Sequence, residues 1–569
     1  MTMHLSGIFE KTCFLALAAA LVSSAVACDS DDTAEGGASG TSGTGGTGGS
    51  GGQSGTTNDS GSDSGLASVE VTTSLGKLRG KADGEVSAFL GIPYAASTEG
   101  ANRWKAPQLA APWSTTRDAT AFGKICPQIT PGSTNYDPNS SEDCLLLNVW
   151  TPDLTPSSPL PVMVWIHGGA FVFGSGGPPY DGTLLARTQG IVVVTINYRL
   201  GALGFLAHPA LSAEGQSSGA YGIQDQAAAL QWVKKEIGAF GGDPGNVTIF
   251  GESAGARSVC WHLTSPGSRG LFQHAIVESG LCMMQGDNLA TAEAQGQRFA
   301  TAMGCTAPDQ AVSCLRGRAP NDLIQSSPNT LPGGLFYQTR GEGFFFQAIV
   351  DGVVMPDQPE TLMAGGKLAM VPVLHGANTS EGALFHTGVF RDVQPATEAE
   401  YKDALTRRFG AKSADIAAQY PVSGFASPND ALTAVTSDAF FVCSARRMAR
   451  LLSAAGVTNY LYSFDGPLDP ALLPALNGKS FHSAEIPYVF GNDFVLGKIP
   501  DAFKPLADAV KGYWTRFAKS GDPNGAMAPA WPAYAASSDQ HLALGMSIAA
   551  AAGHNKAKCD FWDTIPLLP

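Results

Sequence analysis

The sequence predicts an α/β fold with a large, mostly parallel central sheet that carries helices on both faces. Short β-branched runs bounded by Gly, Pro or Asn recur along the chain, as is typical of buried parallel strands. A helical stretch, residues 225–237, separates two of these runs, and strands that alternate with helices favour a parallel sheet. The expected strands are residues 161–166, 191–196, 247–250, 273–277, 370–374 and 459–464.

The first 67 of the 569 residues are not expected to join this fold. Residues 1–27 resemble a secretion signal, because the apolar run 12–22 is too short to span a bilayer comfortably and an Ala-x-Ala site ends at Ala27. Residues 28–67 are almost entirely Gly, Ser, Thr and Asp and predict a flexible tether. Residues 68–569 contain no second tract of this kind and are expected to form one catalytic domain.

Cys28 would become the N-terminal residue after cleavage. Its position resembles the lipobox of bacterial lipoproteins, in which this thiol is acylated, although Ala25 replaces the usual leucine. Simple secretion with a spare cysteine, and a transmembrane anchor, are the alternatives. The protein is therefore expected to be exported, either secreted or tethered by lipid to the membrane of a bacterial cell envelope.

Eight cysteines remain beyond the signal and Cys28, and export places them in an oxidising compartment. They are Cys126, Cys144, Cys260, Cys282, Cys305, Cys314, Cys443 and Cys559. Eight cysteines allow 105 pairings, so spacing alone does not choose among them. No Cys-x-x-Cys pair occurs, so we expect no zinc site and no cofactor. The net charge of -14, without a basic cluster, argues against a nucleic-acid partner.

A candidate nucleophile lies in Gly251-Glu252-Ser253-Ala254-Gly255, directly after the apolar run 246–250. This pattern is typical of a nucleophile elbow, in which a strand passes through a tight turn into a helix and exposes the serine hydroxyl. Two other Gly-x-Ser-x-Gly matches, 48–52 and 215–219, lack a preceding strand. Ser253 is thus the predicted nucleophile, with a plain tight turn as the alternative.

A second glycine-containing segment, His167-Gly168-Gly169-Ala170-Phe171, follows the first expected strand. Paired glycines let backbone N–H groups turn toward a ligand oxygen, which predicts an oxyanion hole. A glycine-rich loop required only for a sharp turn is the alternative.

An acyl-transfer serine needs a histidine base, and the base needs an orienting carboxylate. In α/β-hydrolases the chain order is nucleophile, acid, histidine, which favours His482 as the base and Glu381 as the acid. Weaker candidates for the base are His541, His554, His375 and His386, and those for the acid are Asp351 and Asp465. A metal site at His482 and Glu485 is not expected, because no second acidic helix has matching spacing.

Together these segments resemble the type-B carboxylesterase family of α/β-hydrolases, which includes the cholinesterases. The resemblance covers nearly all of residues 68–569. It rests on Glu142 to Val149, which is similar to the family's second signature, and on Phe250 to Gly255, which is similar to its active-serine signature. The segments 167–171, 380–382 and 481–488 complete the set.

The resemblance implies hydrolysis of small-molecule carboxylic esters through an acyl-enzyme, with Ser253, Glu381 and His482 as the triad. It also implies oxyanion donors at Gly168, Gly169 and Ala254. The implied disulfides are Cys126–Cys144, Cys305–Cys314 and Cys443–Cys559, which leaves Cys260 and Cys282 to pair with each other. Amide or thioester hydrolysis at the same site, and a noncatalytic binding protein of the same fold, remain as alternatives.

One departure from the cholinesterases concerns the loop between Cys126 and Cys144, which contains Tyr136 and no tryptophan. The cholinesterases place a tryptophan face there against a quaternary ammonium, so a choline ester is not the expected substrate. Several aromatic residues could instead line an acyl or alcohol pocket: Phe171, Phe173, Phe345, Phe346, Phe385, Phe440 and Phe441.

Overall fold

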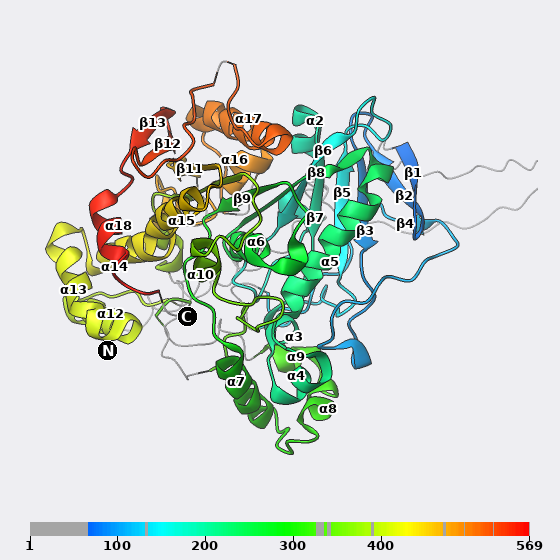
Figure 1. Ribbon diagram of the computed structural model, residues 1–569, viewed down its shortest axis with the longest axis horizontal. Coiled ribbons are helices and arrows are strands. Elements are labelled where there is room, and N and C mark those ends of the chain that lie inside the picture. The colour runs from blue at the N-terminus through cyan, green and yellow to red at the C-terminus, as the bar shows by residue number, and fades with distance from the viewer. Residues whose placement is uncertain are drawn as a thin grey trace, which may run out of the picture.

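A computed structural model gives the arrangement of the chain (Figure 1). It describes residues 67–130, 135–325, 335–337, 343–387, 392–469, 474–493, 496–526 and 528–567. The expected signal peptide, Cys28 and the tether up to residue 66 lie outside the described residues. Among the residues that are described, no helix is long and apolar enough to cross a membrane.

A 13-stranded sheet runs through the described structure, in the order β1-β2-β3-β5-β7-β6-β8-β9-β10-β11-β12-β13 with β4 paired to β2. From β7 to β12 every neighbouring pair is parallel, whereas β1, β2, β3 and β5 form an antiparallel edge and β13 pairs antiparallel with β12. The predicted, mostly parallel central sheet is thus confirmed.

The parallel strands are β6 Leu160–Ile166, β7 Val192–Ile196, β8 Gly242–Glu252, β9 His274–Glu278, β10 Val373–Asn378, β11 Asn459–Phe464 and β12 Gln540–Leu544. The remaining strands are β1 Ala67–Thr73, β2 Gly76–Ala82, β3 Ser87–Pro93, β4 Arg117–Asp118, β5 Leu146–Thr151 and β13 Ala549–Ala552.

Both faces of the central strands are buried, because successive side chains of β6 enter two different cores. Val162, Val164 and Ile166 belong to one hydrophobic cluster, and Met163 and Trp165 belong to the other. Side chains alternate between the faces of a strand, so a continuous apolar run fits a sheet that is covered on both sides.

Different helices cover the two faces. α5 Tyr221–Glu236 and α6 Ala254–Thr264 contribute to the first cluster, and α2 Thr183–Gln189, α16 Ile486–Phe490 and α17 Lys504–Ser520 contribute to the second. The helix expected at 225–237 is α5, which begins earlier, at Tyr221.

The other α-helices lie mainly in two groups. Figure 1 shows α3, α4, α7, α8 and α9 at the bottom of the view and α12, α13 and α14 at the left. They are α3 Gly201–Phe205, α4 Pro209–Gly215, α7 Leu289–Ala302, α8 Ala311–Arg316, α9 Pro320–Ile324, α10 Pro359–Ala364, α11 Gly382–Phe385, α12 Glu398–Phe409, α13 Ser413–Gln419, α14 Pro428–Thr436, α15 Cys443–Ala454 and α18 Lys556–Trp562.

The start of β10 differs from the sequence-based expectation. The run 370–374 was expected to be a strand, but β10 begins at Val373 and continues to Asn378. Met370 is 61% exposed, and Pro372 has no N–H to donate to a ladder. The strand therefore starts after the proline, where its pairing with β9 and β11 begins.

Four disulfides link the described cysteines. They are Cys126–Cys144, Cys260–Cys282, Cys305–Cys314 and Cys443–Cys559. The first, third and fourth are the pairs that the resemblance implied, and Cys260 and Cys282 pair with each other.

Candidate active site

Ser253 occupies a tight turn between β8 and α6. β8 ends at Glu252, α6 begins at Ala254, and Ser253 has φ 57° and ψ -119°. A non-glycine residue with positive φ is strained, and this strain is typical of a nucleophile elbow. The Ser253 N–H donates to the carbonyl oxygen of Glu278 on β9 at 3.0 Å, which anchors the turn to the sheet.

The two flanking glycines are required by the close approach of β6. A Cβ atom would lie 2.5 Å from the carbonyl oxygen of Ile166 if placed on Gly251, and 1.9 Å from it if placed on Gly255. The competing match at 215–219 has no such geometry, because Gly215 ends α4 and the Ser217 hydroxyl donates to Asp351.

The loop after β6 lies directly against Ser253. A Cβ on Gly168 would lie 3.1 Å from Cβ of Ser253, and Gly169 has φ 103°. Among the described residues, no group accepts a backbone hydrogen bond from the N–H of Gly168 or Gly169. Ala254, as the first residue of α6, has no intrahelical acceptor for its N–H. These three N–H groups remain available to an oxygen bound near Ser253.

Glu381 and His482 are brought together from segments 101 residues apart. Nδ1 of His482 lies 2.6 Å from Oε2 of Glu381, and both side chains are buried. Glu381 follows β10, and its other oxygen accepts a hydrogen bond from the Asn378 N–H at 2.7 Å. The carboxylate therefore fixes the orientation of the imidazole.

The other nitrogen of His482 faces Glu252, which immediately precedes Ser253. Nε2 lies 3.0 Å from Oε1 of Glu252, and the same oxygen accepts a hydrogen bond from the Ser483 hydroxyl at 2.7 Å. No hydrogen bond joins the Ser253 hydroxyl to His482 in the described structure. Phe385 and Phe441 pack on the imidazole, with ring centroids 4.9 and 4.8 Å away, and line the same pocket as Ser253.

His482 differs electrostatically from the other described histidines. Burial by itself would lower its pKa, but the nearby carboxylates of Glu252 and Glu381 raise that pKa well above the usual value. Burial lowers the pKa of every other histidine in the described part of the chain. Only His482, among them, is held by two carboxylates.

The sequence-based reasoning did not foresee further buried carboxyl groups behind His482. Glu485 accepts a hydrogen bond from the Ser279 hydroxyl at 3.0 Å and another from the Asn378 amide. Burial, with the negative charges of Glu252 and Glu381, raises its pKa to about 8. Burial also raises the pKa of Glu278 well above its usual value. The sequence did contain a signal for Glu278. It is a carboxyl residue at the end of the apolar strand β9, where a charged side chain is unusual.

The alternative acids have structural partners elsewhere. Asp351 accepts hydrogen bonds from Ser217 and from the backbone N–H groups of residues 353–355. Asp465 is exposed and accepts a hydrogen bond from the Thr379 hydroxyl at 2.6 Å. Neither of them contacts His482.

The alternative bases are likewise engaged away from Ser253. His375 bonds to Asn459, and His386 bonds to Thr436 and to the carbonyl oxygen of Val393. His541 and His554 pack against each other with ring centroids 4.8 Å apart. No group of three or more His, Cys, Asp or Glu side chains within the described ranges is placed to hold a metal ion.

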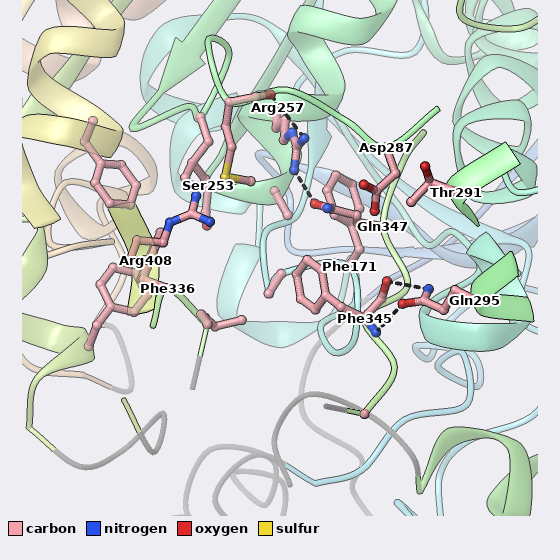
Figure 2. Close-up of a pocket in the computed structure, with 18 of the residues that line it drawn as sticks. Phe171, Ser253, Arg257, Asp287, Thr291, Gln295, Phe336, Phe345, Gln347 and Arg408 are labelled. Carbon is pink, nitrogen blue, oxygen red and sulfur yellow. Dashed lines mark hydrogen bonds between the residues drawn. The ribbon is translucent and has the colours of Figure 1, made fainter. Parts of the chain in front are cut away.

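A pocket of about 200 Å³ opens beside Ser253 (Figure 2). Phe171, Phe345, Phe385 and Phe441 line it, as expected from the sequence. Phe173, Phe346 and Phe440 do not line it; Phe346 packs on Phe299, and Phe440 packs on Phe336. The wall is completed by Ala170, Ala254, Arg257, Leu281, Met284, Asp287, Thr291, Gln295, Arg298, Leu335, Phe336, Gly343, Gln347 and Arg408.

Comparisons with known proteins agree with this geometry. The family model of the Carboxylesterase family matches residues 67–562. The chain is 38% identical to para-nitrobenzyl esterase of Bacillus subtilis (strain 168) over 490 residues, which cover 84% of this chain and 95% of that protein. It is 34% identical to carboxylesterase 1D of Rattus norvegicus over 532 residues, which cover 87% of this chain and 93% of that protein.

A solved structure of PNB esterase is also similar. It has a TM-score of 0.74 and 36% sequence identity, and the match covers 86% of this chain and 99% of that structure. The chain therefore belongs to the Carboxylesterase family, and it is a carboxylic ester hydrolase of the α/β-hydrolase fold that acts on small-molecule esters.

Proposed function

We propose that this enzyme cleaves carboxylic esters through an acyl-enzyme formed on Ser253, with His482 as the base and Glu381 as its orienting acid. The observation that carries the proposal is the 2.6 Å contact between His482 and Glu381, next to a serine held in a strained elbow. A buried carboxylate on Nδ1 leaves Nε2 as the nitrogen that exchanges protons.

In the first half-reaction, Oγ of Ser253 attacks the ester carbonyl carbon while Nε2 of His482 accepts the hydroxyl proton. The carbonyl oxygen becomes an oxyanion and accepts hydrogen bonds from the N–H groups of Gly168, Gly169 and Ala254. The imidazolium then donates its proton to the departing alcohol, and the acyl group stays on Ser253. Water, deprotonated by His482, releases the acid in the second half-reaction.

Glu252 enters this scheme through its contact with Nε2. Its carboxylate contacts the nitrogen to which Ser253 gives its proton in the proposed first step, so this contact must yield before the transfer. The carboxylate also stabilises the positive charge that His482 acquires during acyl transfer. Glu252 is accordingly a positioning residue in this proposal.

A p-nitrophenyl ester series of increasing acyl length tests the proposal on the wild type and on Ser253→Ala. Loss of the nucleophile should lower kcat by about four to six orders of magnitude. Equal rates in the two proteins would refute the assignment of Ser253. Matched anilide and thioester substrates in the same series test amide and thioester hydrolysis, which use the same machinery.

We also propose that the mature enzyme is exported and that Cys28 carries a lipid. The Ala-x-Ala site before Cys28 and the Gly/Ser-rich tether after it support this proposal. Intact mass of the protein isolated from membranes should exceed the mass of the cleaved chain by that of the acyl groups. A mature N-terminus without added mass would indicate plain secretion.

A further inference from the structure

Arg257 places a buried positive charge in the substrate pocket. Arg257 lies one turn after Ser253 on α6, and its backbone N–H donates to the Ser253 carbonyl oxygen at 2.8 Å. The side chain is only 2% exposed, yet it lines the pocket that contains Ser253. Figure 2 shows it in the upper part of the pocket, directed toward Gln347.

All hydrogen-bond acceptors of this guanidinium are neutral. Nη1 donates to Oε1 of Gln347, and Nη2 donates to the carbonyl oxygens of Met284 and Gln285 at 3.2 Å each. Nε is buried and has no hydrogen-bond partner. Within the described residues, no carboxylate forms an ion pair with Arg257.

A buried cation whose hydrogen-bond acceptors are all neutral is costly, because no direct ion pair offsets its desolvation. The cost appears in the pKa of Arg257, which burial lowers to about 10 while the charge of Asp287 partly opposes that decrease. The guanidinium is still positively charged near neutral pH. It therefore meets the substrate as a cation.

The described residues of the wall carry more positive than negative charge. Among the described residues that line the pocket, three are arginines, Arg257, Arg298 and Arg408, and one is acidic, Asp287. The chain as a whole carries a net charge of -14, so this local excess of positive charge opposes the overall composition. Such a pocket attracts anions and concentrates them near the nucleophile.

The wall around Arg257 is held by hydrogen bonds. Gln295 on α7 donates to the carbonyl oxygen of Phe345 at 3.0 Å and accepts from the Phe345 N–H at 3.2 Å (Figure 2). This pairing fixes the segment that carries Gln347, which in turn holds Arg257. Phe336, Phe385 and Phe441 provide an apolar part of the same pocket. A preformed site with an apolar wall and one placed cation orients its ligand.

We propose that this pocket selects esters that carry a carboxylate, with Arg257 binding the anion while Ser253 attacks the ester carbonyl. This inference deepens the proposed function and rests on it. A carboxylate on the substrate would give Arg257 the ion-pair partner that no described residue provides, and the planar guanidinium suits that group.

The test compares each anionic ester with a neutral ester of matched size. For an anion on the acyl side, the pair is mono-p-nitrophenyl glutarate and p-nitrophenyl pentanoate. For an anion on the alcohol side, the pair is 4-acetoxybenzoate and its methyl ester. The wild type should prefer the anionic member of at least one pair in kcat/KM. A preference for the neutral member in both pairs would overturn the inference.

Two variants then assign the preference to Arg257. Arg257→Gln should lower the ratio of anionic to neutral kcat/KM by about 10- to 100-fold, chiefly through KM, because one hydrogen bond between charged groups is lost. Gln347→Glu keeps Arg257 but places a carboxylate in contact with it, and should lower the same ratio. The control Arg269→Gln removes an exposed positive charge outside the pocket lining and should alter the ratio by less than about threefold.

The outcomes separate this inference from the proposed function. If Arg257→Gln and Gln347→Glu slow both members of each pair equally, Arg257 has only a structural role and the inference fails. If Ser253→Ala retains activity on both members, the proposed function itself fails. Loss of activity in Ser253→Ala, with a ratio that depends on residues 257 and 347, supports both.

Discussion

Oε1 of Glu252 lies 3.0 Å from Nε2 of His482, the nitrogen opposite the one that contacts Glu381. The imidazole is thus held between two buried carboxylates, and a third carboxyl, that of Glu485, has a pKa raised to about 8 behind them. This arrangement stabilises the protonated imidazole, which in the proposed mechanism forms as the serine loses its proton. It also sets the pH at which the base becomes active.

The pH dependence of the enzyme should reflect this contact. His482 acts as a base only when neutral, and its carboxylate neighbours raise its pKa well above 6.5. Activity should therefore increase with pH through an acidic limb above pH 6.5. Glu252→Gln removes one of the charges that raise the pKa of His482. The acidic limb of kcat/KM should therefore shift to lower pH in this variant. A limb that stays in place would show that Glu252 does not influence the base.

Replacing the orienting acid should impair catalysis strongly. Glu381→Gln removes the charge that fixes His482 and should lower kcat by about 10³- to 10⁴-fold, as in other serine triads. Asp465→Asn is the matched control, because Asp465 is exposed and its carboxylate, among the described residues, accepts a hydrogen bond only from Thr379. Steady-state kinetics on one ester compares the two variants. Similar losses in both would contradict the role of Glu381.

The elbow should tolerate no side chain on its second glycine. Gly255→Ala would place a Cβ 1.9 Å from the Ile166 carbonyl oxygen, and should lower the free energy of unfolding by about 2–4 kcal/mol. Gly238→Ala is the control, since its Cβ would meet open space, and should change that free energy by less than about 1 kcal/mol. Guanidinium denaturation monitored by tryptophan fluorescence measures both.

The disulfides should differ in their contribution to stability. Cys443–Cys559 joins residues 116 positions apart, whereas Cys305–Cys314 joins residues 9 positions apart. Because the longer loop restricts the unfolded chain more, removing the first bond by paired Cys→Ser changes should cost about 2 kcal/mol more than removing the second. Equal shifts in denaturation midpoint would mean that loop entropy does not dominate.

Much of the central sheet could be predicted from the sequence because its signal is local. β11 Asn459–Phe464 has the predicted boundaries, since its apolar run is bounded by a loop and buried on both faces. β8 begins at Gly242, before the predicted residue 247, because Gly242 pairs with Leu160 across an irregular register. That pairing depends on β6, which lies about eighty residues earlier in the chain.

The candidate site was predictable where its residues stand in recognisable motifs. The contact between Glu381 and His482 follows from chain order in the fold, and the glycines flanking Ser253 follow from the elbow. The polar wall at Arg257 and Gln347 was not foreseen, because helix α6 and a distant loop meet only in the folded chain. Arg257 was visible as the only charged residue between Ala254 and Leu263, but its burial could not be read from that spacing.

The most direct test of the central claim is intact-mass analysis after exposure to an organophosphate such as diisopropyl fluorophosphate, followed by peptide mapping. Convergence of Ser253, His482 and Glu381 predicts one covalent adduct, on the peptide that contains Ser253, and loss of rapid labelling in His482→Ala. An adduct on another serine, or undiminished labelling of Ser253 without His482, would contradict the account.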